Sequence, residues 1–257
     1  MNDIFSLAGK TALVAGASRG LGLAIAQGLA DAGAHVILAA RSLDKLEAHV
    51  KALTAKGYSA SAVRLDVADS KSIDAALTGL GDIDILLNVA GMNIRKRFQD
   101  YTKQDYDTIL QTNLNGIVEL TQKVGAKMIA RGAGGKIISI GSLVNNVGLP
   151  YVSIYSITKG ALGSLTKVLA AEWGRYNIQV NCIAPGFIIT DLNRAMWQDD
   201  KMNQWRLGVG ANPNVGEPQD VAALATFLSG RGAKYITGQI IAVDGGVSTT
   251  AIWPFEP

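Results

Sequence analysis

Short, nearly continuous apolar segments alternate along the chain with segments of helical periodicity. The apolar segments are rich in Val and Ile, as is typical of strands buried on both faces. They are Thr11–Ala15, His35–Ala40, Ala60–Leu65, Ile83–Asn88, Lys136–Ile140, Ile178–Ile183 and Gln239–Val243. The helical segments include Gly20–Ala32, Leu43–Lys56, Lys103–Ala130, Val152–Tyr176 and Gln219–Leu228. This alternation predicts an α/β fold, a Rossmann-like doubly wound parallel sheet of about seven strands with helices on both faces.

Residues 190–217 interrupt the alternation. The segment places large apolar side chains, among them Met202 and Trp205, between Gly and Pro residues. Because it follows a strand end, where open α/β sheets bind ligands, we expect a mobile lid over a substrate. A packed pair of peripheral helices is the alternative. Residues 71–81 are few, so the helix before the fourth strand should be brief.

Composition limits the function classes. The 257 residues, 48% hydrophobic and 18% charged, are typical of one globular domain, and a net charge of +3 is too small to favour nucleic acid. No run of about 18 apolar residues predicts a membrane span, and no secretory signal is present. Cys182 is the only cysteine, so no internal disulfide can form, which fits a cytoplasmic location. Only His35 and His49 occur, which argues against a Ser–His–Asp triad or a histidine-rich metal site.

A glycine-rich turn follows the first strand and opens the first helix. Glycines let the backbone approach a pyrophosphate, and the helix N-terminus offers free N–H groups and the positive end of its dipole. We therefore expect this turn to bind a dinucleotide through Gly16, Ser18, Arg19, Gly20, Leu21 and Gly22. A tight turn without a ligand is the alternative.

The end of the second strand indicates which dinucleotide binds. An acidic residue there would bind the adenosine ribose hydroxyls and repel a 2′-phosphate. The chain has Ala39-Ala40-Arg41 instead, with no acid before Asp44. Because Arg41 and Arg19 could grip a 2′-phosphate, NADP(H) is favoured, with NAD(H) as the alternative.

Ser142, Tyr155 and Lys159 form the most specific chemical pattern. Tyr155 and Lys159 are four residues apart in a predicted helix, so they share one face. A free phenol, with a pKa near ~10, is a poor acid or base at neutral pH. A neighbouring cation favours the phenolate, which suits a tyrosine for general acid–base catalysis on a carbonyl. Alone, the tyrosine would be interpreted as a packed aromatic and the serine as a turn residue.

Together these motifs resemble the short-chain dehydrogenase/reductase family over essentially the whole chain. The resemblance also includes Asp66-Val67 after the third strand, Asn88-Val89-Ala90-Gly91 after the fourth, Asn113 in a helix, and Pro185-Gly186, Ile188 and Thr190 after the sixth. Within the family, the opening residues 2–7 and Arg95 are most similar to the sugar-acid and polyol dehydrogenases, such as the gluconate 5-dehydrogenases.

The resemblance implies roles for these residues. Besides the glycine turn and Arg41, cofactor binding falls to Asp66, Val67, Asn88, Ala90, Gly91, Tyr155, Lys159, Pro185, Gly186, Ile188 and Thr190. The catalytic set is Asn113, Ser142, Tyr155 and Lys159. Tyr155 is then the acid in ketone reduction and the base in alcohol oxidation. Ser142 holds the substrate oxygen, and Asn113 holds a water that connects Lys159 to solvent.

Three positions depart from the usual pattern of the family. Ala15 and Val89 replace a threonine and a second asparagine, so we expect an apolar contact between them in place of polar bonding. Gly141 replaces a serine that often precedes the catalytic one, a change expected to matter little.

The substrate is less well defined. Substrate binding is expected of Ser142, Val144, Leu149, Tyr155, Arg95, Met196 and Trp197. Arg95 or Arg97 could clamp the carboxylate of a sugar acid or lie as surface arginines on a loop. The apolar residues leave open a more apolar aliphatic or cyclic ketone, or a 3-oxoacyl thioester. A non-catalytic nucleotide-binding sensor is the alternative from another class, and a lyase or epimerase on the same fold is a third.

The predicted organisation is a single dinucleotide-binding catalytic domain over residues 1–257, with a small-molecule ketone or alcohol as its partner and neither nucleic acid nor membrane. The two longest predicted helices carry apolar faces, and the family usually pairs these helices, which favours a homotetramer. Trp253 and Phe255 lie in the C-terminal tail. Because exposed aromatic side chains are unfavourable, we expect this tail to dock on a neighbouring subunit or a pocket rim.

Overall fold

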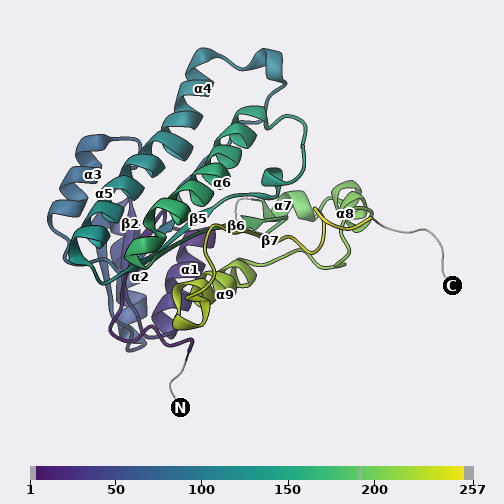
Figure 1. Ribbon diagram of the computed structural model, residues 1–257. Helices are drawn as coiled ribbons and strands as arrows, with labels where there is room; N and C mark the ends of the chain where they lie inside the picture. Colours follow the sequence, from purple (N-terminus) through teal and green to yellow (C-terminus); the bar gives the residue numbers. More distant parts are fainter. Residues whose placement is uncertain (1–3, 191–192, 252–257) are drawn as a thin grey trace.

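One seven-stranded sheet organises the chain, which a computed structural model describes for residues 4–190 and 193–251 (Figure 1). All strand pairs are parallel, in the order β3-β2-β1-β4-β5-β6-β7. The strands are β1 Thr11–Ala15, β2 His35–Ala40, β3 Ala60–Arg64, β4 Ile85–Asn88, β5 Gly135–Ile140, β6 Ile178–Pro185 and β7 Ile240–Val243. The predicted fold class is therefore confirmed. The strand order reverses between β1 and β4, which is the topological switch point where such sheets bind ligands.

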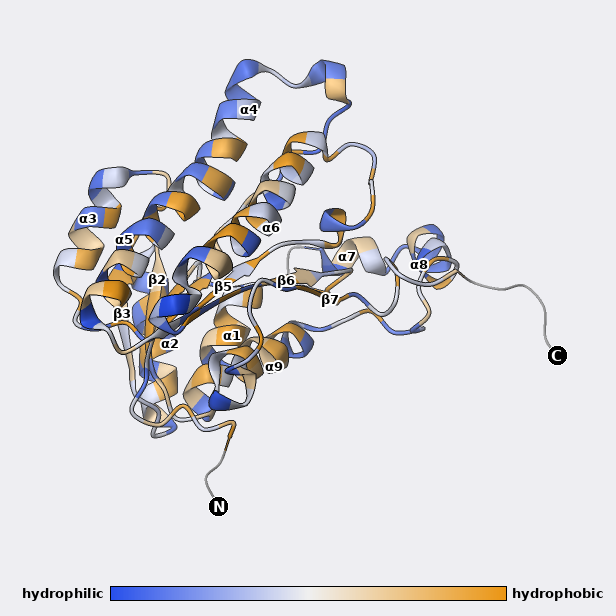
Figure 2. Ribbon diagram, in the orientation of Figure 1, coloured by the Kyte–Doolittle hydropathy of each residue, from blue (hydrophilic) through white to orange (hydrophobic). Residues whose placement is uncertain are grey.

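Helices cover both faces of the sheet (Figure 1). The helices packed on one face are α1 Gly20–Asp31, α2 Leu43–Ala55 and α9 Pro218–Ser229, and those packed on the other are α3 Ser70–Thr78, α5 Gly116–Arg131 and α6 Ser153–Trp173. Figure 2 shows mainly hydrophobic strands between helices striped with hydrophobic and hydrophilic residues. Successive strand residues feed opposite cores, so Val14 is buried on the first face and Leu13 on the second. Helix α3 has nine residues, as brief as predicted.

The predicted helix Lys103–Ala130 is confirmed, but a π-helical turn interrupts its α-helical geometry. The structure has α4 Lys103–Leu110, a π-helical turn Gln111–Asn115 and then α5. A single π turn inserts one extra residue without ending the helix, and such turns are frequent at functional sites. Here the turn contains Asn113, whose side chain is completely buried.

Residues 193–217 contain two short helices, α7 Arg194–Trp197 and α8 Asp200–Leu207. The Phe187 ring joins them to the end of β6, because its centroid lies 5.3 Å from the ring centroids of both Trp197 and Trp205 in edge-on contacts. Of the two alternatives from the sequence, the structure shows the packed helix pair, whereas movement of the segment as a lid stays a prediction.

Strand β4 begins at Ile85, two residues later than predicted. The reason is Asp84, whose carboxylate accepts the Thr11 N–H at 3.0 Å and pairs with Arg131 at 3.2 Å. In the part of the chain that the structure describes, none of the helices combines the length and apolar character needed to cross a bilayer.

The start of α5 predicts a sharp difference between two glycines. A Cβ on Gly116 would lie 1.8 Å from the Val67 carbonyl oxygen, whereas a Cβ on exposed Gly160 in α6 would meet nothing within 4 Å. Gly116→Ala should lower the free energy of unfolding by about 3 kcal/mol because backbone must move. Gly160→Ala should raise it by up to ~1 kcal/mol through helix propensity. Urea denaturation measures both, and a Gly116→Ala chain as stable as wild type would refute the close packing.

Candidate active site

The loops that follow β1 and β4 touch at the switch point. Gly16 has a φ of +101°, and a Cβ there would lie 2.6 Å from the Ala90 backbone nitrogen. A Cβ on Gly22, in the first turn of α1, would lie 2.1 Å from the Gly16 carbonyl oxygen. The turn therefore needs glycine at both positions, and it brings bare backbone to the N-terminus of α1. This cradle fits a dinucleotide pyrophosphate.

The expectation that an apolar contact between the Ala15 and Val89 side chains joins these loops is wrong. Ala15 belongs to the core under α3, α5 and α6, whereas Val89 packs against the core on the opposite face of the sheet. The loops are joined by backbone instead, since the Ala15 carbonyl accepts the N–H groups of Val89 at 2.9 Å and Ala90 at 2.8 Å. A threonine or asparagine side chain is not needed for these bonds.

The end of β2 fixes the other side of the glycine turn. The first two N–H groups of the turn donate to the Ala39 carbonyl at 2.8 and 3.1 Å. His49 of α2, which the sequence did not single out, bonds through Nε2 to the Ser18 carbonyl at 3.1 Å. Arg19 and Arg41 are exposed beside this anchored turn. Arg41 follows the end of β2, and Arg19 lies in the glycine turn. Two guanidinium groups without a carboxylate at the strand end fit a 2′-phosphate.

Asp66 and Val67 lie after β3 on the same edge of the sheet. The Asp66 carboxylate accepts the Ala68 N–H at 3.0 Å, and the Asp66 N–H donates to Ser72 Oγ at 2.9 Å. Val67 is buried against the start of α5. These contacts fix the β3 loop against α3 and the start of α5, at the edge of the sheet where the adenine end of a dinucleotide is expected.

The loop after β6 reaches back to the glycine turn. Thr190 Cγ2 would lie 3.8 Å from a Cβ on Gly20. Asn193, which sequence reasoning missed, accepts the Thr190 N–H at 2.7 Å and donates to the Ile188 carbonyl at 2.8 Å. Its position three residues after a threonine is a local turn signal that could have identified it. The Ile188 side chain lies in the core, so only its backbone faces the loop.

Lys159, Tyr155 and Asn113 come together as predicted. Lys159 is 4% exposed, and its Nζ donates to the Ile140 carbonyl at 2.6 Å and lies 5.5 Å from the centroid of the Tyr155 ring. A Cβ on Gly91 would lie 3.6 Å from Lys159 Nζ and 3.5 Å from Asn113 Oδ1. The lysine and the buried amide therefore border the β4 loop next to the dinucleotide cradle, and the Tyr155 ring lies beside the lysine.

The Asn113 amide is bonded at both ends to the protein. Its Oδ1 accepts the Met92 N–H and its Nδ2 donates to the Met92 carbonyl, both at 2.8 Å. Nδ2 also lies 3.4 Å from Thr158 Oγ1, which donates to the Tyr155 carbonyl at 2.7 Å. The side chain thus fixes the β4 loop against α6. The water that Asn113 is expected to hold stays a prediction.

Ser142 is connected to the lysine through a residue that the sequence did not single out. Asn145 accepts the Ser142 N–H at 2.8 Å and donates to the Lys159 carbonyl at 2.7 Å. The Ser142 hydroxyl itself accepts the Val144 N–H at 3.4 Å. The expectation that Gly141 matters little is wrong, because a Cβ there would lie 2.5 Å from Asn145 Oδ1.

Asn88 and Cys182 are buried beside the site, and their contacts indicate structural rather than chemical roles. Asn88 Nδ2 donates to Thr121 Oγ1 at 2.9 Å and to Ser139 Oγ at 3.3 Å, which ties β4 to α5 and β5 rather than to the cradle. Burial raises the pKa of the Cys182 thiol to about 11, although Lys159 acts in the opposite direction. The thiol is therefore protonated at neutral pH and is a poor nucleophile.

The expected substrate residues lie on four segments: the loops after β4 and β5, the first turn of α6, which carries Tyr155, and α7. Arg95, on the loop after β4, places Nη1 3.8 Å from the sulfur of Met196 in α7. Val144 and Leu149 are half-buried in the loop after β5. Trp197 is 8% exposed, and its indole N–H has no acceptor among the described residues. A substrate oxygen would satisfy that N–H, but contact of Trp197 with substrate stays a prediction.

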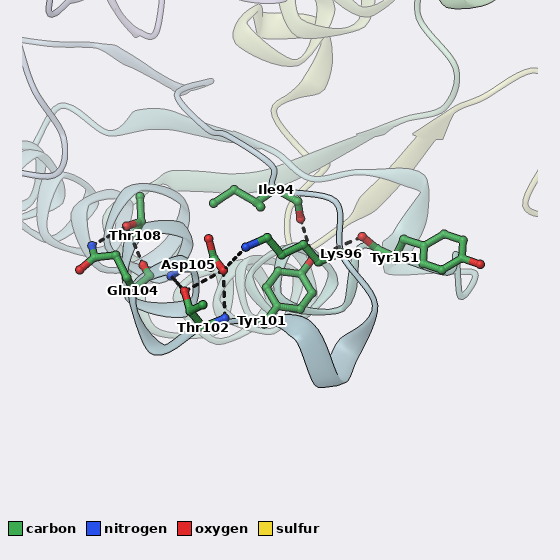
Figure 3. A network of polar contacts seen from close by, with 8 residues as sticks. All are labelled: Ile94, Lys96, Tyr101, Thr102, Gln104, Asp105, Thr108 and Tyr151. Atoms are coloured by element: carbon green, nitrogen blue, oxygen red, sulfur yellow. Dashed lines mark hydrogen bonds and ion pairs between the residues drawn. The ribbon is translucent and has the colours of Figure 1, made fainter.

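A polar network fixes the loop that carries Arg95 (Figure 3). Lys96 donates its backbone N–H to the Tyr151 carbonyl at 3.1 Å and pairs through Nζ with Asp105 at 2.6 Å. The Tyr101 hydroxyl donates to the Ile94 carbonyl at 2.5 Å and to the Tyr151 carbonyl at 3.3 Å. Both neighbours of Arg95 are therefore anchored.

Tyr151 has an unusual backbone at the centre of this network. Its φ of +68° lies in the left-handed region, which costs a non-glycine residue about 1–3 kcal/mol and persists only when the surroundings enforce it. Its carbonyl takes both bonds from the loop, and Figure 3 shows its ring directed away from the network. The strained turn links the loop after β4 to the start of α6.

Comparison with known proteins identifies the class. Residues 16–248 match a family model described as enoyl-(acyl carrier protein) reductase. The chain belongs to the short-chain dehydrogenase/reductase family, and its homologues in that family are named dehydrogenases and reductases that act on CH–OH groups.

Several relatives that cover nearly the whole chain are sugar-acid enzymes, although a 3-oxoacyl-[acyl-carrier-protein] reductase of Staphylococcus aureus strain Mu50 is 37% identical over 93% of this chain and 98% of its own. Gluconate 5-dehydrogenase of Gluconobacter oxydans strain 621H is 36% identical over 96% of this chain and 98% of its own. 5-Keto-D-gluconate 5-reductase of Escherichia coli K12 is 34% identical over the same shares. The crystal structure of a gluconate 5-dehydrogenase from Burkholderia cenocepacia J2315, in complex with NADP and tartrate, superposes with a TM-score of 0.92 at 35% identity, covering 97% of this chain and 99% of that one.

The network around Asp105 predicts a pH dependence. The hydrogen bond from Lys96, helped by Thr102, lowers the pKa of Asp105 from 3.8 to about 2. A lowered pKa in the folded state means stabilisation that is complete above pH ~4 and is lost as the pH falls through about 2. The stability gap between wild type and Asp105→Asn should therefore stay constant from about pH 8 to 5 and close below about pH 4.

Denaturation at each pH measures this gap. Asp107→Asn is the matched control, because Asp107 lies on the same helix in an exposed pair with Lys103 and should change stability little. A gap for Asp105→Asn that stays constant down to about pH 2 would show that the ion pair does not stabilise the loop.

Proposed function

We propose that this chain is an NADP(H)-dependent oxidoreductase that interconverts the ketone of a keto sugar acid with the corresponding secondary alcohol. The observation that carries the proposal is the meeting of Lys159 and Asn113 at Gly91, next to the glycine cradle at the switch point, with the Tyr155 ring 5.5 Å from Lys159 Nζ. This arrangement offers a proton donor directly beside the place expected for a nicotinamide. The similarity to gluconate 5-dehydrogenases supports the substrate class.

The side chains divide the chemistry among them. NADP(H), when bound, supplies or accepts the hydride at the substrate carbon. Tyr155 gives its proton to the carbonyl oxygen in reduction and takes it back in oxidation. The Lys159 ammonium next to the ring favours the phenolate that this transfer leaves. The Ser142 hydroxyl donates to the substrate oxygen while negative charge develops there.

The residues at the ribose end support NADP(H). Arg41 and Arg19 are exposed at the end of β2 and in the glycine turn, and guanidinium groups bind phosphate in bidentate fashion. His49 fixes the backbone between them. NAD(H) is the alternative, since both arginines could be solvated surface groups.

Arg95 is proposed to bind the carboxylate of the substrate. Lys96, the neighbour of Arg95 in the chain, is paired with Asp105 in a salt bridge. No carboxylate among the described residues pairs with Arg95, so its charge is available to a substrate. The anchored loop holds Arg95 beside Met196, across the expected pocket. Met196, with half-buried Leu149, also favours the second candidate, a more apolar ketone or a 3-oxoacyl thioester.

A homotetramer is proposed as the assembly. Apolar side chains remain exposed on the layer of α4, α5 and α6 (Figure 1), namely Tyr106, Val118, Ile157 and Val168. A second copy would cover them. The tail with Trp253 and Phe255 lies outside the described residues, so its docking stays a prediction.

Substrate identity is tested by NADPH oxidation with 5-keto-D-gluconate and with neutral aliphatic and cyclic ketones. Arg95→Ala should raise KM for the sugar acid by about 10–100-fold, because a charge-assisted bond is lost, and leave neutral ketones unchanged. Arg97→Ala, two residues away, tests the other arginine that could clamp the carboxylate, and we expect it to leave KM for the sugar acid unchanged. Tyr155→Phe should lower kcat by about 10²–10⁴-fold.

The outcomes separate the candidates. Equal effects of Arg95→Ala on both ketone classes would reject the carboxylate clamp and favour the apolar ketone. Cofactor binding without turnover across the panel would instead favour the sensor.

Cofactor preference is tested at Arg41. Arg41→Asp replaces a phosphate-binding cation with a carboxylate that repels the 2′-phosphate and suits the ribose hydroxyls. We expect KM for NADPH to rise by about 10–100-fold and KM for NADH to fall. NADH serves as the internal control because it lacks the 2′-phosphate. An unchanged ratio of kcat/KM for the two cofactors would reject the assignment.

A further inference from the structure

The Asn145 side chain bridges the two segments that carry the proposed catalytic residues. Its Oδ1 accepts the Ser142 N–H at 2.8 Å, and its Nδ2 donates to the Lys159 carbonyl at 2.7 Å. Its own N–H donates to the Ser142 carbonyl at 2.9 Å, which closes a short turn after β5. One amide group thus connects the serine loop to the middle of α6.

Two glycines provide the space for this amide. A Cβ on Gly141 would lie 2.5 Å from Asn145 Oδ1, and a Cβ on Gly163 would lie 2.9 Å from Asn145 Nδ2. Gly163 follows Lys159 by four residues, so its N–H is the helical partner of the Lys159 carbonyl. Because Gly163 has no side chain, the second lone pair of that carbonyl is accessible to Asn145.

The bridge complements the bond that the lysine side chain makes. Lys159 Nζ donates to the Ile140 carbonyl at 2.6 Å, at the end of the strand that leads to Ser142. Two hydrogen bonds thus link α6 to the end of β5 and the serine loop, one from Asn145 and one from the Lys159 ammonium. If Asn145 were replaced, the bond from the ammonium would be the one of these two that remains. Tyr155 lies one helical turn before Lys159 on the same face, so it shifts whenever this part of α6 shifts.

We propose that Asn145 is a positioning residue that sets the Ser142 hydroxyl relative to the Tyr155 phenol. It acts through the Ser142 backbone and the Lys159 carbonyl, without contact between Asn145 and substrate. This inference deepens the proposed function and rests on it. It also explains the departure at Gly141, where a serine side chain would collide with the amide.

The experiment compares Asn145→Ala and Asn145→Asp with Asn146→Ala, the next residue in the chain, which is exposed. In Asn145→Asp the carboxylate still accepts the Ser142 N–H but places an oxygen against the Lys159 carbonyl. Both Asn145 variants should lower kcat by about 10–100-fold per NADPH-binding site, because small displacements of reacting groups have such effects. Their Kd for NADPH should stay within about twofold of wild type, and Asn146→Ala should keep the wild-type kcat.

Hydrogen exchange at the Ser142 amide provides a readout that does not need turnover. Exchange should accelerate in Asn145→Ala and stay slow in Asn145→Asp, which keeps the acceptor. A merely structural role predicts a lower Tm with wild-type kcat per binding site, and that result overturns the proposal, as does unchanged exchange in Asn145→Ala. If the wild-type chain turns over no ketone, the proposed function fails by itself, and exchange alone then decides whether Asn145 holds Ser142.

Discussion

The contact between the loops after β1 and β4 is the constraint on which the site depends. With Gly16 against the Ala90 backbone, the two central strands end in one shared surface of bare main chain. Gly91, the next residue, then borders both Lys159 and Asn113. A side chain at Gly16 would separate the loops, and the proton-donating side of the site would move away from the cradle. The proposed cofactor site and the proposed catalytic site are therefore one structural unit.

The buried ammonium of Lys159 explains why so much polar structure surrounds it. Burial of a charge is costly unless partners compensate for lost hydration. In the described ranges, 4–190 and 193–251, no salt bridge to a carboxylate involves Lys159, and the Ile140 carbonyl is its hydrogen-bond acceptor. Two hydrogen bonds between Asn113, in the π turn, and the Met92 backbone fix the loop after β4. The hydrogen bonds of Asn145 fix the loop after β5 against α6. Such a network is rigid only when each member is satisfied.

The sequence predicted whatever follows from periodicity and spacing. The strands and most helices were predicted because alternating segments differ in apolar period, and Lys159 was placed beside Tyr155 because helical residues four apart share a face. The π turn was missed because one inserted residue hardly changes a helical pattern. Asn145 was missed because its bond to the Lys159 carbonyl, fourteen residues away, leaves no local signature that distinguishes it from an asparagine in a solvated turn, whereas Asn193 makes local bonds that a turn signal could have identified. The importance of Gly141 depends on Asn145, so neither position could be interpreted alone.

The two halves of the site are held in different ways, and this difference bears on specificity. The proton-transfer half is fixed by buried bonds between core elements. The substrate half consists of loops, and its rigidity comes from exposed or half-buried contacts: the Lys96 pair and the left-handed turn at Tyr151. The left-handed backbone of Tyr151 is held by the two hydrogen bonds that its carbonyl accepts, one from the Lys96 N–H and one from the Tyr101 hydroxyl. Sequence changes in these loops can therefore redirect Arg95 without disturbing Lys159, which is how one scaffold accommodates different ketones.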